Sequence, residues 1–91
     1  MRKKLNQFFI EKVLCVIFNR TRGREGIRTR MHIPGELIVR KFPKHQRGDV
    51  WRALRRLEAE GLIEKKGGTE SYWLTDRGWR RALEICSDSN E

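Results

Sequence analysis

The sequence predicts a single α+β domain, in which helices precede and follow a short β-hairpin. The chain has 91 residues, a length that suffices for one small hydrophobic core. Apolar residues recur at helical spacing in several segments, and a Gly-Gly pair separates two short strand-like runs. The expected order of elements is therefore helix, short strand, helix, turn, helix, hairpin, helix.

Residues 3–19 are expected to form the first helix, because they contain neither Gly nor Pro and place apolar residues at helical spacing. From Val13 onward this segment is apolar nearly all round. One face can cover the core, and the simplest cover for the other face is a second copy of the chain. We therefore expect a homodimer. The side chains expected at its interface are Phe9, Val13, Val16 and Ile17.

Residues 20–33 form a basic loop that leads into a short strand near residues 29–33. Five arginines lie between Arg20 and Arg30. Guanidinium groups match phosphate oxygens geometrically, so phosphate contact is one interpretation of this loop. A solvated loop without a partner is the other, and the sequence alone leaves both open.

Residues 34–60 predict two helices separated by a turn. Pro34 suits the first position of a helix that ends near Lys41, ahead of a Phe-Pro pair. A polar turn then enters a second helix at Asp49–Glu60, which Gly61 is expected to cap. The apolar face of this second helix consists of Val50, Ala53, Leu54 and Leu57.

Residues 62–74 predict a hairpin whose turn is formed by Gly67 and Gly68, because two glycines can supply the positive φ angles of a tight turn. Thr75 or Asp76 then begins a last helix over residues 75–87. Together with the preceding elements, this hairpin completes an α+β layout over residues 1–91.

The net charge is +9, and it is concentrated in the first two thirds of the chain. Residues 1–66 hold 18 of the 21 Lys and Arg residues, whereas residues 67–91 are mildly acidic. A basic surface of this kind points to a polyanionic partner.

Residues 50–83 carry the motif LEAEGLI followed by YWLTDRG. In these motifs, and over residues 34–85 as a whole, the chain resembles winged helix-turn-helix proteins, in particular PadR-like and MarR-like transcription regulators. The resemblance implies a recognition helix at residues 46–60 and a β wing at residues 62–74. It also implies a dimer that binds a roughly palindromic DNA operator.

A recognition helix enters the major groove, where side chains on its outer face reach base edges. The residues expected to read bases are Gln46, Arg47, Arg52 and Arg55. The residues expected to contact the DNA backbone are Lys44, His45, Arg56, Lys65 and Lys66. Asp49 either caps the helix or repels phosphate.

A plainer interpretation of these basic residues stays open. Arg55 and Arg56 can pair with Glu58 and Glu60 on a solvated helix face. Lysines at strand ends also protect sheet edges against association. The tryptophans at positions 51 and 73 are expected in the core or at an interface, since neither belongs to a paired aromatic surface for base stacking.

Cys15 and Cys86 are the two cysteines. In a reducing cytosol free buried thiols are the expected state, and a disulfide within the chain or across a dimer is the alternative. Neither cysteine stands in a CxxC pair or at metal-ligand spacing to a histidine, so we expect no metal. No arrangement of nucleophile, base and orienting partner is visible, so we expect no enzyme activity and no cofactor.

The longest apolar run covers the six residues Val13–Phe18, far fewer than the ~20 that a membrane span requires. We expect a cytoplasmic protein with no membrane partner and no small-molecule ligand. The function expected is that of a sequence-specific regulator, a repressor, that binds double-stranded DNA. A non-specific architectural DNA-binding protein and a winged-helix protein-interaction module are the alternatives.

Overall fold

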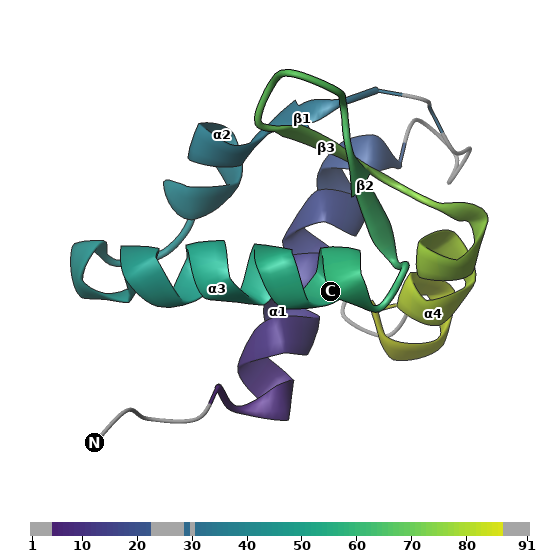
Figure 1. Ribbon diagram of the computed structural model, residues 1–91. Helices are drawn as coiled ribbons and strands as arrows, with labels where there is room; N and C mark the ends of the chain where they lie inside the picture. Colours follow the sequence, from purple (N-terminus) through teal and green to yellow (C-terminus); the bar gives the residue numbers. More distant parts are fainter. Residues whose placement is uncertain (1–4, 23–28, 30, 87–91) are drawn as a thin grey trace.

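The computed structural model describes residues 5–22, 29 and 31–86 (Figure 1). Within these ranges the α-helices are α1 (Gln7–Thr21), α2 (Gly35–Val39), α3 (Arg47–Ala59) and α4 (Asp76–Cys86). The strands are β1 (Ile33–Pro34), β2 (Ile63–Lys65) and β3 (Ser71–Leu74), and a 3-10 turn, η2, covers Lys44–Gln46. The predicted α+β class is therefore confirmed.

The three strands form one small antiparallel sheet in the order β1-β3-β2. Tyr72 of β3 pairs with Ile33, and Leu74 pairs with Ile63. These four side chains are buried, because alternate residues of a strand point to the same face. One face of the sheet therefore covers the core, and the other is turned outward.

The β2–β3 turn differs from the prediction in one detail. Gly68 has the positive φ value of 77°, but the positive φ expected at Gly67 is not observed. One left-handed residue suffices, since Lys66 closes the turn through two backbone bonds. Its N–H donates to the Ser71 carbonyl (2.8 Å), and its own carbonyl accepts from the Thr69 N–H (3.0 Å).

Helix α1 lies at the centre of the fold and packs against both α3 and α4 (Figure 1). It begins at Gln7 because the Asn6 side chain caps it, accepting a hydrogen bond from the Phe8 N–H at 2.7 Å. Leu5 and Asn6, predicted to be helical, lie outside the helix, and residues 3 and 4 lie outside the described residues. The helix ends at Thr21, two residues beyond the predicted end.

The buried face of α1 corrects two of the residues expected at a dimer interface. Val13 and Ile17 are 0% exposed within a single chain, so a second chain cannot contact them. They fill the space between α1 and the elements packed around it, so the chain itself covers this part of the apolar surface of α1. Phe9 and Val16 are half-buried at the edge of this core.

The segment between α1 and α3 also differs from the prediction. The strand expected at residues 29–33 is reduced to Ile33–Pro34. Pro34 belongs to this strand, opposite Ser71, so α2 starts at Gly35 and not at Pro34. The helix ends at Val39, ahead of the predicted Lys41, and η2 then winds directly into α3 at Arg47. Helix α3 therefore begins two residues before the predicted Asp49.

Thr75 sets the start of α4. Its hydroxyl accepts a hydrogen bond from the Gly78 N–H (2.9 Å) and donates to the Gly61 carbonyl (2.7 Å). A Cβ atom on Gly78 would clash with the Leu62 carbonyl oxygen, so only glycine allows α4 to approach the chain this closely. Gly61 itself has φ 77°, as expected for a residue that ends α3.

Helix α4 is also tied to α1. The Phe18 and Trp79 rings pack at a centroid distance of 4.9 Å. Cys15 and Cys86 form a disulfide, with their Cα atoms 5.7 Å apart. The expectation of free thiols is therefore wrong, because the fold brings two cysteines from opposite ends of the chain together. No helix in the described part of the chain is long and apolar enough to cross a membrane.

Candidate nucleic-acid interface

Helix α3 divides into a buried face and a basic exposed face. Val50, Ala53, Leu54 and Leu57 are buried, as the sequence predicts. At 100° per residue, Arg52 and Arg55 lie opposite these residues, with Arg56 beside them. The helix therefore presents several guanidinium groups on the side away from the core.

These three arginines and Leu5 line a surface hollow of about 440 Å³. We refer to Arg52, Arg55, Arg56 and Leu5 as the arginine hollow. Arg52 Nη1 lies 3.0 Å from Asp49 Oδ1, and Arg56 Nε lies 2.8 Å from Glu60 Oε2. Among the described residues, Arg55 has no acidic partner within ion-pair distance. The hollow thus combines one unpaired guanidinium with two that are held in place.

The sequence left the role of Asp49 open between a helix cap and repulsion of phosphate, and the structure shows an ion pair with Arg52. Its carboxylate is bound to Arg52 across one helical turn, and it lies in the first turn of α3, where a negative charge is favourable. The plainer interpretation of Arg56 also holds in part, because it pairs with Glu60 as expected. The expected pairing of Arg55 with Glu58 is not observed.

Arg47 lies apart from the arginine hollow. It lines a second depression of about 300 Å³, with Arg40, Glu36, Val39 and Trp51. On the helix, Arg47 and Arg56 are nine positions apart, which places them on opposite flanks of α3. Arg40 was not among the predicted site residues. Its signal in the sequence is the basic Arg40-Lys41 pair directly after α2.

The half-buried Trp51 packs where α2 meets the β2–β3 hairpin, next to the hydrogen bond that the Gly35 N–H donates to the Glu70 carbonyl (2.7 Å). Its ring lies so close to Gly35 that a Cβ atom there would clash with it. It also lines a small depression with Glu70 and Ser71 of the hairpin. Trp51 therefore packs between elements, as the sequence predicts.

The turn before α3 holds three predicted contact residues. Lys44 and His45 are exposed in η2, and Gln46 is half-buried. Gln46 precedes the helix, and its side chain makes no capping hydrogen bond. These residues stand next to the start of α3, not along its outer face.

Lys65 and Lys66 are exposed at the end of β2 and in the turn that follows it. Neither lines the arginine hollow or the depression around Arg47. The predicted residues thus fall into three groups: the arginine hollow, the region around the start of α3, and the hairpin.

Trp73 is on the outer face of the sheet and not in the core. Its indole Nε1 donates to Glu64 Oε1 at 3.0 Å, and its ring stacks on His32 with centroids 4.7 Å apart. Trp73 was expected in the core or at an interface, and the core alternative is wrong, since Trp73 alternates with the buried Tyr72 and Leu74 along β3. Its place at an interface stays a prediction.

Charged side chains of α3 and the hairpin influence the pKa of Tyr72. The pKa of Tyr72 is raised above its usual value, first by burial and then by the carboxylates of Glu70 and Glu58, while Arg55 opposes the shift. The Tyr72 hydroxyl therefore remains protonated and able to donate a hydrogen bond. Glu70 also lines a depression with Trp51 of α3. No pattern in the sequence indicates this proximity, because it depends on how the hairpin folds back.

Most of the predicted basic loop, residues 20–30, lies outside the described residues. Of its arginines, Arg22 lies over the Phe18 ring, 5.2 Å from its centroid. Arg24, Arg28 and Arg30 lie outside the described residues. The prediction of phosphate contact by this loop stays a prediction.

The described residues contain no cluster of three or more side chains that could hold a metal ion. No protein-family model matches the chain, and neither a curated protein nor a solved structure matches it. The candidate interface is therefore defined by its own geometry, namely a helix that carries arginines on its exposed side next to a basic turn and a β-hairpin.

Proposed function

We propose that the chain is a winged helix-turn-helix protein that binds double-stranded DNA through α3 and the β2–β3 hairpin. The order of elements supports this proposal: α2, η2 and α3 are followed directly by the hairpin, and β1 completes the sheet. In this interpretation α3 is the recognition helix and the hairpin is the wing.

The arginine hollow is the observation that carries the proposal. An α-helix fits the major groove, and planar guanidinium groups can bind phosphate oxygens or guanine edges with two hydrogen bonds each. Arg55 lines the hollow and has no acidic partner within ion-pair distance in the part of the chain that the structure describes, so DNA can bind it without displacing such a partner. The exposed pair of Arg56 with Glu60 is worth about 0.2–1 kcal/mol, so DNA can exchange it at small cost. Arg52 is half-buried and is held by Asp49.

The roles follow from position. Arg52 and Arg55, on the outer face of α3, read base edges, together with Gln46 and Arg47 at its start. Positive side chains around this centre contact phosphates and fix the register of the protein on DNA. These are Lys44, His45, Arg56, Lys65 and Lys66, with Arg40 as an addition from the structure.

We propose further that two copies bind an inverted repeat and act as a repressor. The part of α1 that remains exposed supports a second copy, because Phe8 is 82% exposed and the half-buried Phe9 and Val16 lie on the same helix. Binding as a dimer doubles the number of base contacts, and occupation of the operator would block other proteins from the same site.

The test is a selection from random DNA duplexes at physiological salt, where non-specific binding is weakened. Convergence on an inverted repeat, with half-sites about one helical turn apart, supports a dimeric regulator. Retention of duplexes without a common motif would indicate an architectural DNA-binding protein. The absence of duplex binding would overturn the proposal and leave a protein-interaction module.

A further inference from the structure

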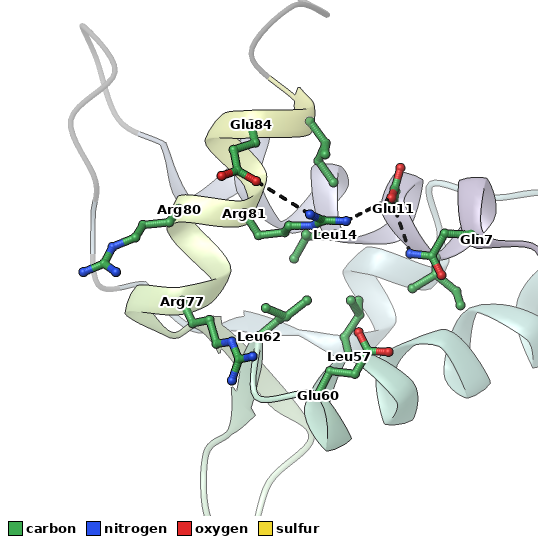
Figure 2. A pocket seen from close by; sticks show the side chains of 12 residues that line it. Gln7, Glu11, Leu14, Leu57, Glu60, Leu62, Arg77, Arg80, Arg81 and Glu84 are labelled. Carbon is green, nitrogen blue, oxygen red and sulfur yellow. Dashed lines mark hydrogen bonds and ion pairs between the residues drawn. The ribbon is translucent and has the colours of Figure 1, made fainter.

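A groove of about 510 Å³ lies between α1, the end of α3 and α4 (Figure 2). Its volume lies within the range of small-molecule sites, which is about 300–1,000 Å³. The apolar side chains that line it are Ile10, Leu14, Leu57, Leu62 and Ile85. All five are aliphatic, and no aromatic ring is among the described residues that line the groove.

The carboxylates around the groove already have arginine partners. Arg81 lies 3.6 Å from both Glu11 and Glu84 (Figure 2). Glu60 is bound by Arg56 at 2.8 Å, outside the groove. Each of the three carboxylates therefore has an arginine partner, but Arg81 is shared by two of them, so this set keeps one negative charge.

Arg77 and Arg80 then remain as positive charges without an acidic partner among the described residues. Figure 2 shows Arg77 beside Leu62 at the groove, whereas Arg80 extends away from it. The Arg77 guanidinium also lies close to the backbone at Gly61, since a Cβ atom added to Gly61 would be 3.8 Å from Arg77 Nη1. One guanidinium group is thus placed at the end of an aliphatic surface.

We infer that this groove binds a small aliphatic monocarboxylate. The carboxylate pairs with Arg77, which can form two parallel hydrogen bonds to its oxygens. The hydrocarbon chain lies on Leu62 and Ile85, the half-buried aliphatic residues of the groove. The groove therefore prefers a ligand that has both a carboxylate and a hydrocarbon chain. An anion without a hydrocarbon chain lacks the apolar contact, and a neutral hydrocarbon lacks the ion pair with Arg77.

The inference does not require DNA binding, because Arg77, Leu62 and Ile85 do not belong to the arginine hollow. The ion pair of Glu60 with Arg56 is a link between the groove and the hollow. It also does not depend on a second copy of the chain. Its experiment therefore needs only the protein itself and a simple ligand.

The test is a titration of ¹⁵N-labelled protein with hexanoate, followed by NMR chemical shifts. We expect saturable shifts at amides of residues 57–62 and 77–85, and affinity that rises about two- to threefold for each methylene from butyrate to hexanoate. 1-Hexanol and sulfate serve as the neutral tail and the anion without a tail, and both should bind at least tenfold more weakly.

Arg77→Gln and Arg80→Gln form the matched pair of variants. Both positions are exposed on α4, and neither has an acidic partner within the described part of the chain, so both variants should fold. We expect hexanoate to bind about tenfold more weakly to Arg77→Gln and within twofold of the original affinity to Arg80→Gln. Equal affinity in the two variants, equal binding of 1-hexanol, or shifts centred on Arg52 and Arg55 would overturn the inference.

Discussion

Cys15 and Cys86, which are 71 positions apart in the sequence, form a disulfide that ties the middle of α1 to the end of α4. The bond closes a loop that contains α2, α3 and the whole sheet. Loss of the bond therefore affects the chain entropy of the unfolded state over most of the domain.

Reduction of this disulfide should lower the free energy of unfolding by about 4 kcal/mol, on a chain-entropy estimate for a loop of this size. The measurement is guanidinium unfolding with and without a reductant. A Cys15→Ala/Cys86→Ala variant is the control, since its stability should match that of the reduced protein and should not respond to reductant. Equal stability of the oxidised and reduced protein would show that the bond contributes nothing.

Arg52→Ala should reduce discrimination between the selected DNA site and a one-base variant of it, by about 1–3 kcal/mol, because a bidentate base contact is lost. Binding to unrelated DNA should remain. Competition binding on the two sites measures the difference. An equal loss of affinity for all DNA sequences would mean that Arg52 contacts phosphate. Arg80→Ala serves as the control for the loss of one arginine from the surface.

Lys65→Ala/Lys66→Ala should weaken binding to all duplexes alike. Each phosphate contact contributes about 0.9 to the slope of log affinity against log salt concentration, so the double variant should lower that slope by about 2. The slope is obtained from affinities measured over a range of salt concentrations. An unchanged slope would place the hairpin away from the DNA and leave the two lysines as protection of the sheet edge.

Gly78→Ala should destabilise the fold by about 1–3 kcal/mol, because the added Cβ atom clashes with the Leu62 carbonyl and forces α4 away from it. Gly48→Ala is the matched variant, since nothing lies within 4 Å of a Cβ atom at that position in α3. There the alanine should stabilise the protein by up to about 1 kcal/mol. Thermal unfolding of both variants tests the prediction. Similar effects at the two glycines would contradict the close packing of α4 on Leu62.

Patterns that repeat within one element were readable from the sequence. The apolar spacing in α3 identified its buried residues, because a helix places every third or fourth residue on one face. The Gly-Gly pair located the hairpin, and Gly61 marked the end of α3. The opposite placement of the arginines on α3 follows from the same periodicity.

Properties that depend on two distant segments were decided by the tertiary structure. The sequence identified Val13 and Ile17 as apolar but not what would cover them, and the chain's own packing buries them completely. It likewise could not show that Cys15 and Cys86 would meet, nor that Glu70 would line a depression with Trp51 of α3. Periodicity determines which way a side chain points from its own element, whereas the partner it finds depends on how distant parts of the chain pack together.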